Sequence, residues 1–346
     1  MTRPTIQDVA RVAGVSKSTV SRVLNGVEEY VDINTRRRVE KVIAELEYRP
    51  NALARSLITK RSLAVGLLIS DVANAFYHPV IHGVEQVAVE AGYDTFLCNT
   101  NYAVERGLHF IRSLLSKNVD GVLIMASSVS DEWIVELARH NVPTVVLDWK
   151  PNISQGRIGS IVVDFAAGIQ MAVDHLVNLG HHRFAHVAGP LNLPTSRLRY
   201  AVFLAALARH GIPATDVTLL EGNLQFEGGQ RVLPVLLELS PRPTAVFAAN
   251  DLTGLGLIWA AHNQGLRIPD DLSVVGLDDI ESSAHSSPPL TTIALPKREI
   301  GIAAMQMLLT LMRNGTDTSA VHEACVESSF VERQSTAQPP KSPVVT

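Results

Sequence analysis

The chain has 346 residues, 46% hydrophobic and 18% charged, which predicts two or three domains with sizeable cores. Its N-terminus is polar and no run approaches about 20 apolar residues, which excludes a membrane span and a secretory signal and predicts a cytoplasmic protein. The formal net charge of −4 is unevenly divided, because residues 1–62 hold twelve Lys/Arg and seven Asp/Glu and the remainder carries −9. A basic head on an acidic body predicts a polyanionic partner for the head.

The first 25 residues predict two short helices joined by a tight turn. Thr5 and Asp8 have the spacing of a capping box, Gly14 suits a left-handed turn, and Ser16 can cap the second helix. One face of that helix is apolar, and the other carries short or basic hydrogen-bonding side chains: Lys17, Ser18, Ser21, Arg22 and Asn25. This pattern is typical of a helix-turn-helix that reads a DNA major groove. An ordinary pair of packed helices is the alternative.

A third helix favours the DNA-binding interpretation. Asp32 can cap it, and apolar residues then repeat at helical spacing: Val39, Val42, Ile43 and Leu46. Three short helices can share a small core that two could not form.

Residues 50–62 form the first predicted boundary. Pro50 ends the preceding helix or opens a new one, and Asn51 to Ile58 could form about two helical turns. So short a helix is marginal alone in water. The segment is therefore either a plain linker or a hinge helix that folds only against DNA and a dimer mate.

From Leu63 onward, apolar strands alternate with helical stretches, which predicts βαβ units on parallel sheets. The first strand series is 63–69, 95–98, 121–126, 144–147 and 160–163, and the second is 184–188, 217–220, 245–249, 272–276 and 291–294. Helices are expected at 80–90, 165–179, 196–210, 253–263 and 297–311. Doubly wound sheets bind ligands at the carboxyl ends of their strands. Two such sets therefore predict one ligand site in the cleft between two subdomains.

The run from Thr5 to Asn25, followed by Tyr48 to Leu57, resembles the signature and hinge of the lactose/galactose-repressor (LacI/GalR) family of bacterial transcription regulators. The resemblance extends over about residues 3–335 and implies a periplasmic-binding-protein-like body. It also implies that Leu57 wedges into a minor-groove step while Ala54 allows close approach. The DNA-binding residues expected in this way are Thr5, Ser16, Lys17, Ser18, Thr19, Ser21, Arg22, Asn25, Asn51, Ala54, Arg55 and Leu57.

The expected fold class is therefore α/β, with an all-α helix-turn-helix head. The expected segments are a DNA-binding domain at 1–49, a hinge at 50–62, an effector-binding and dimerisation domain at 63–335 and a flexible tail at 336–346. Within the third, one subdomain takes about 63–163 and 295–322, and the other about 164–294 and 323–335. The tail is rich in Pro, Ser and Thr with no apolar heptad, which argues against a tail-made tetramer and for a homodimer.

Several residues just past strand ends could line the cleft. Carboxylates, an amide, an arginine and aromatic rings together suit the hydroxyls and apolar face of a sugar. By resemblance, the effector-contacting positions are Asp148, Arg197, Asn250 and Asp278, with Phe76, Tyr77 and Trp149 beside them. Leu224 replaces a frequent aromatic, so a stacking contact is absent there. For Asp251 and Asp279, helix N-capping is the structural alternative.

Enzyme motifs are lacking in the sequence. It has no Gly-Lys dipeptide for a phosphate loop and no Gly-x-Ser-x-Gly elbow, and Trp259 stands where a dinucleotide fingerprint needs its third glycine. His182 and His186 straddle a turn and a strand, so no metal or cofactor site is expected. The interpretation is a repressor that binds a pseudo-palindromic operator and responds to a small effector, expected to be a sugar or sugar derivative. The alternatives are a nucleobase effector, or a transport solute-binding protein with no DNA role.

Overall fold

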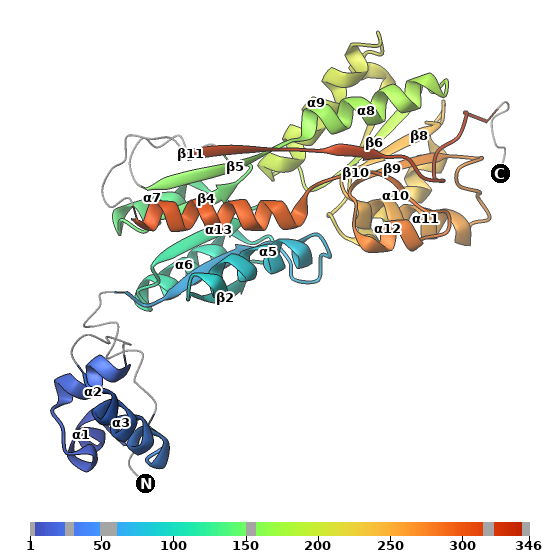
Figure 1. Ribbon diagram of the computed structural model, residues 1–346. Coiled ribbons are helices and arrows are strands. Elements are labelled where there is room, and N and C mark those ends of the chain that lie inside the picture. The colour runs from blue at the N-terminus through green and yellow to red at the C-terminus, as the bar shows by residue number, and fades with distance from the viewer. Residues whose placement is uncertain (1–3, 25–30, 49–60, 150–156, 314–321, 341–346) are drawn as a thin grey trace. The chain divides into compact units, whose positions relative to one another are not determined.

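A computed structural model describes residues 4–24, 31–48, 61–149, 157–313 and 322–340 (Figure 1). The chain divides into two compact units, residues 1–62 and 63–346. Among the described residues, no helix is long and apolar enough to cross a membrane. Cys98 is buried and Cys325 is exposed, and neither forms a disulfide.

The described residues of the first unit form three helices, α1 (Ile6–Ala13), α2 (Lys17–Leu24) and α3 (Ile33–Glu45). Thr5 and Asp8 form the predicted capping box, and Gly14 ends α1 in the left-handed conformation with φ 64°. The Oγ of Ser16 accepts from the amide of Thr19 at 3.1 Å, which caps α2. The three-helix head predicted from the sequence is confirmed.

The head has one small core to which all three helices contribute. Val9, Val20 and Val39 are fully buried at its centre, one from each helix. The carboxylate of Asp32 accepts from the amides of Asn34 and Thr35, both at 3.0 Å, as expected of the cap of α3. Because each helix buries only one narrow stripe, none would be stable without the others.

The second unit is built on two six-stranded sheets. The first has the order β11-β5-β4-β3-β1-β2, and all its pairs are parallel. Its strands are β1 (Ala64–Ile69), β2 (Asp94–Asn99), β3 (Gly121–Met125), β4 (Thr144–Leu147), β5 (Ile158–Asp164) and β11 (His322–Glu327). The helices that pack with it are α5 (Tyr77–Glu90), α6 (Val104–Ser116), α7 (Asp131–Arg139) and α13 (Lys297–Arg313).

The second sheet has the order β12-β10-β9-β8-β6-β7, with β12 antiparallel to β10. Its strands are β6 (Phe184–Ala188), β7 (Val217–Glu221), β8 (Ala245–Ala248), β9 (Ser273–Asp278), β10 (Thr291–Ala294) and β12 (Ser329–Val331). The accompanying helices are α8 (Phe165–Asn178), α9 (Pro194–Ala208), the 3-10 turn η1 (Ala214–Asp216), α10 (Phe226–Glu238), α11 (Asp251–Asn263) and α12 (Glu281–His285). The two doubly wound subdomains expected from the sequence are confirmed.

The chain passes between the two sheets three times. Asp164 and Phe165 join β5 to α8, Leu295 and Pro296 join β10 to α13, and Ser328 joins β11 to β12. The Oγ of Ser328 donates to the carbonyl oxygen of Asp164 at 2.5 Å, so two of the crossings are hydrogen-bonded to each other. Figure 1 shows β11 and β12 as one long red ribbon that spans both sheets.

Two predicted boundaries differ from the structure. Residues 323–327 pair with β5 in the first sheet, so the third crossing lies at Ser328 and not at 322–323 as expected. Residues 336 and 337 were assigned to a free tail, but the hydroxyl of Thr336 bonds His175 at 2.8 Å and the carbonyl oxygen of Ala337 lies 2.8 Å from the ring of His181. The polar composition of this stretch does not indicate these hydrogen-bond partners, because they come from distant parts of the chain.

Helix α13 packs closely on α5 of the first subdomain. A Cβ on Gly83 of α5 would lie 2.2 Å from the carbonyl oxygen of Arg298, and one on Gly301 would lie 2.1 Å from that of Val80. The two glycines therefore allow α5 and α13 to touch backbone to backbone. Since α13 follows a crossing directly, this contact fixes one end of the crossing to the first subdomain.

Candidate functional site

The exposed face of α2 is the first candidate site. Lys17, Ser18 and Arg22 are exposed, whereas Val20 and Val23 turn into the core. The Oγ of Ser16 lies 2.7 Å from that of Ser18 and 2.9 Å from the Oγ1 of Thr19, which orders the hydroxyls at the start of the helix.

These basic and hydroxyl side chains can donate to phosphates and base edges. Ser21 is half-buried on the same helix. Thr5, also expected to contact DNA, is exposed, and its hydroxyl donates to the carboxylate of Asp8 at 2.8 Å. The remaining expected DNA contacts, Asn25, Asn51, Ala54, Arg55 and Leu57, lie outside the described residues.

The second candidate site is a small cavity of about 40 Å³ in the second unit. Its lining comes from both subdomains and from the crossings between them: Phe76, Met125, Ala126, Ser127, Leu147, Asp148, Val163, Phe165, Thr195, Arg199 and Leu295. Several of these residues follow the carboxyl ends of strands, where ligands bind to open α/β sheets. A polar cavity of this volume holds one or a few water molecules.

Asp148 contributes a carboxylate from the first subdomain. It follows β4 with φ 51° and accepts from the amide of Val163 at 2.7 Å. Burial raises the pKa of Asp148 to about 6, while the hydrogen bond from Val163 and the guanidinium of Arg199 act in the opposite direction. Asp148 therefore changes charge near neutral pH.

Asp278 contributes a second carboxylate at the end of β9, with φ 123°. It is buried, and burial raises its pKa to about 7; the charge of Asp251 adds to this rise, and Arg199 and Lys297 oppose it. Asp278 is buried and Asp148 is half-buried, and the charge of Arg199 acts on the pKa of both. Carboxyl groups with pKa values shifted in this way are common at functional sites.

Arg199 on α9 provides that guanidinium. It lines the cavity, donates to the carbonyl oxygen of Ala249 at 2.8 Å and lies over the ring of Phe165, 4.8 Å from the ring centre. Stacking on the ring and the backbone hydrogen bond hold it in place beside the two carboxylates.

The structure does not bring Arg197 to the cavity. Its side chain is exposed and donates to the carbonyl oxygen of Leu191 at 2.6 Å. Two residues along a helix point in directions about 200° apart, so only one of Arg197 and Arg199 can face the cleft. Of the two arginines, the structure therefore places Arg199, and not the predicted Arg197, at the cavity. Helical spacing from the buried Phe203, one turn further along the helix, could have distinguished them.

The remaining predicted residues lie around the cavity without all lining it. Phe76 lines it, and Tyr77 is buried behind Phe76 in an edge-to-face contact with ring centres 5.1 Å apart. Asn250 caps α11: its Oδ1 accepts from the hydroxyl of Thr253 at 2.7 Å and its Nδ2 donates to the carbonyl oxygen of Leu224 at 2.9 Å. Both polar atoms of the Asn250 side chain therefore already have hydrogen-bond partners.

Trp149 is half-buried and packs against the core of the first subdomain, away from the cavity lining. Leu224 is buried and packs with Leu193 and Ala249, so an aliphatic side chain takes the place of the absent aromatic. The structure also shows a contact between the subdomains that sequence reasoning missed. The Nε2 of Gln225 donates to the carboxylate of Asp71 at 2.8 Å.

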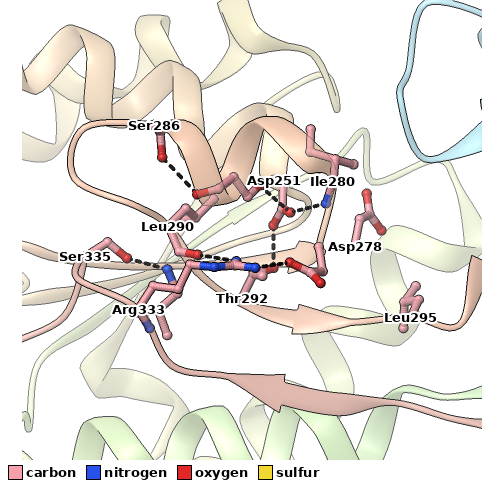
Figure 2. Close-up of polar contacts among 12 residues, drawn as sticks. Asp251, Asp278, Ile280, Ser286, Leu290, Thr292, Leu295, Arg333 and Ser335 are labelled. Carbon is pink, nitrogen blue, oxygen red and sulfur yellow. Dashed lines mark hydrogen bonds and ion pairs between the residues drawn. The ribbon is translucent and has the colours of Figure 1, made fainter.

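Asp251 and Asp279 have structural roles, although neither is a simple helix cap. The carboxylate of Asp251 accepts from the amide of Ile280 at 2.9 Å and from the hydroxyls of Ser283 and Thr292 at 2.6 and 2.5 Å. Asp279 pairs with Arg333 at 2.6 Å. Figure 2 shows the carboxylate of Asp251 with its contact to Ile280, and the guanidinium of Arg333 reaching toward Leu290.

The fold and these sites define a DNA-binding protein with a ligand-binding body, and comparison with known proteins specifies the class. Residues 5–51 match the bacterial regulatory proteins of the lacI family, and residues 173–336 match a periplasmic binding protein-like domain. The chain is 37% identical to the HTH-type transcriptional repressor PurR of Vibrio atlanticus (strain LGP32), over 95% of this chain and 98% of the relative. It is 35% identical to catabolite control protein A of Priestia megaterium, over 96% and 99% respectively.

Comparison with solved structures indicates the same class of protein. A lac repressor dimer bound to operator and the anti-inducer ONPF superposes with a TM-score of 0.86 at 34% identity, over 97% of this chain and all (100%) of that one. A complex of the transcriptional regulator CelR with cellobiose gives 0.71 at 29% identity, over 96% of this chain and 100% of that one. The chain belongs to the lacI family of bacterial regulatory proteins. It is a DNA-binding transcriptional repressor with an effector-binding domain and is not an enzyme.

Proposed function

We propose that the protein binds its operator as a homodimer and that a small hydroxylated ligand, of the sugar class, controls this binding from between the two subdomains. The observation that carries the proposal is the cavity whose lining joins Asp148 of the first subdomain to Arg199 of the second. Asp278 is not among its lining residues, but the charge of Arg199 acts on its pKa. Carboxylates accept from hydroxyl groups and a guanidinium donates to them. A ligand that touches both sets favours one relative orientation of the subdomains.

The size of the cavity bears on the mechanism. An enclosed space of about 40 Å³ accommodates a few water molecules. We therefore expect the subdomains to separate before they close on a ligand of the size of a sugar. The hydrogen bond between Gln225 and Asp71 is one contact that this opening must break.

A nucleobase is the second candidate for the effector. The sequence similarity to repressors named PurR favours it. The cavity offers rings from Phe76 and Phe165, which can stack on a planar base or on the apolar face of a sugar. Its charged groups, Asp148 and Arg199, favour the sugar, because several hydroxyls can both donate to a carboxylate and accept from a guanidinium.

The deciding experiment uses the full-length chain and an operator selected from random duplex DNA. Operator affinity is measured alone and with ribose, cellobiose, gluconate, guanine and hypoxanthine, each in turn. We expect one class to change operator affinity on the order of 5–150-fold. Arg199→Ala should lose this response and keep the affinity of the ligand-free protein, and Arg197→Ala is the matched control that should keep both. A full response in Arg199→Ala would place the effector elsewhere.

The DNA contacts are proposed for the exposed face of α2. Arg22→Ala should cost about 1–3 kcal/mol of operator binding if the guanidinium pairs with a guanine, and the loss should be confined to one operator position. An equal loss on random DNA would make Arg22 a phosphate contact only. The role of Leu57 as a minor-groove wedge stays a prediction, tested by DNA bending in Leu57→Ala.

A further inference from the structure

The turn that carries Asp278 has an unfavourable backbone conformation. Asp278 and the next residue, Asp279, have φ values of 123° and 53°, and neither is a glycine. Two consecutive residues of this kind persist only where surrounding contacts hold them. The position of the Asp278 carboxylate therefore depends on whatever restrains this turn.

Two of the restraints come from within the second subdomain. The carboxylate of Asp251 holds the amide of Ile280, and the guanidinium of Arg333 donates to the carboxylate of Asp279 and to the carbonyl oxygen of Leu290 at 2.8 Å (Figure 2). These contacts tie the turn to its own subdomain. They give it no connection to the other one.

A third restraint comes from a crossing between the subdomains. Lys297 is the first residue of α13, directly after the crossing at Leu295 and Pro296. Its ammonium donates to the carbonyl oxygens of both Asp278 and Asp279, the latter at 2.8 Å, and approaches that of Leu295 at 3.4 Å. One charged group thus joins both strained residues to the crossing itself.

Helix α13, which carries Lys297, is held firmly by the first subdomain. Helix α13 packs backbone to backbone on α5 through Gly83 and Gly301, so its start cannot shift without moving the first subdomain. Leu295 also lines the cavity. A displacement of the Asp278 turn can therefore pass through Lys297 to α13 and from there to the first subdomain.

We propose that Lys297 is a positioning residue that transmits ligand engagement at Asp278 to the crossing at Leu295–Pro296 and so to the orientation of the subdomains. This inference rests on the proposed function, because it takes Asp278 as part of the ligand site. It adds a residue that need not touch the ligand: its ammonium is occupied by backbone carbonyl oxygens on the turn and the crossing.

The test uses the full-length chain with Lys297→Met, which keeps the length of the side chain and removes the donor. Lys297→Arg restores a donor, and Lys117→Met, at an exposed lysine after α6, is the matched control. If Lys297→Met does not fold, Lys297→Gln, which keeps a neutral donor, replaces it. The first measurement needs no ligand: amide hydrogen exchange at residues 278–281 and 297–301.

We expect exchange at residues 278–281 to quicken about tenfold or more in Lys297→Met and to return toward the wild-type rate in Lys297→Arg. If residues 278–281 of Lys297→Met exchanged at the wild-type rate, the inference would be overturned. The second measurement is operator affinity with whichever compound of the panel shifts the wild type. Lys297→Met should still bind operator and lose most of that shift, and a full shift would also overturn the inference.

The two hypotheses fail in different ways. If no compound shifts the wild-type protein, the proposed function fails, and the exchange measurement alone decides whether Lys297 restrains the turn. If the wild type responds and Lys297→Met responds equally, the proposed function stands and the role of Lys297 is refuted.

Discussion

Replacing Asp278 with asparagine should stabilise the second unit at neutral and higher pH while removing the ligand response. The side chain keeps its shape and loses a charge that burial disfavours. The pKa of Asp278 is raised from 3.8 to about 7 in the folded protein. Each pH unit between those values corresponds to about 1.4 kcal/mol, which sums to about 4 kcal/mol as an upper limit.

The direction of the pH dependence of stability follows from the protonation states of Asp278 in the folded and unfolded protein. A carboxyl group whose pKa is raised on folding binds a proton more tightly in the folded state, so its contribution to stability is complete below pH 3.8 and is lost as pH rises to about 7. The asparagine variant has no such group. The free energy of unfolding of the wild type should therefore fall relative to the variant by about 1.4 kcal/mol per pH unit between pH 5 and 7, and then level off.

Urea unfolding at pH 5, 6, 7 and 8, followed by tryptophan fluorescence, measures this difference. Trp133, Trp149 and Trp259 all lie in the second unit, so the signal excludes the head. Asp216→Asn, at an exposed carboxylate, is the control and should run parallel to the wild type at every pH. If the free energy of unfolding of Asp278→Asn ran parallel to that of the wild type at every pH, the reasoning would be refuted. That result would mean that burial does not disfavour the ionised carboxylate.

Three further predictions concern stability. Thr5→Ala removes the capping box and should lower the stability of the head by about 1 kcal/mol in thermal melts. Asp251→Ala leaves the Ile280 amide and two hydroxyls without their acceptor and should destabilise the second unit by more than about 3 kcal/mol in urea, with Asp251→Asn less affected. Gly107→Ala places a Cβ 1.8 Å from the ring of Trp133 and should cost about 1–3 kcal/mol, with altered fluorescence of the folded state.

The head was predictable because its signals are local. A capping box, a left-handed glycine and a second cap each act within four residues, and the apolar stripes of three short helices leave one arrangement for a shared core. The same holds for the buried strands, whose apolar runs stand out against the helices between them. Helical stretches were expected between the strands in general, but the sequence did not single out helices α6, α7, α10 and α12 or strands β11 and β12.

The ligand site was only partly predictable. Asp148 and Asp278 follow strand ends, and strand ends can be read from the chain. The choice between Arg197 and Arg199 depends on the rotation of α9 about its axis, which is set by packing of α9 against its subdomain. The partners of the C-terminal segment, His175 and His181, lie more than 150 residues away in sequence, as the separations of 161 and 156 residues show.

The sequence by itself determined the kinds of element, the helix-turn-helix head and the two α/β subdomains, because caps, turns and apolar periodicity act over a few residues. The tertiary structure alone decided which side chains meet. Burial raises the pKa of both Asp148 and Asp278, and the charge of Arg199 acts on both because α9 presents that side chain to the cavity. Lys297 reaches the turn at Asp278 because the chain crosses between the subdomains just before it. Such effects depend on the distance between atoms and on the exclusion of water, and no local pattern of residues encodes either.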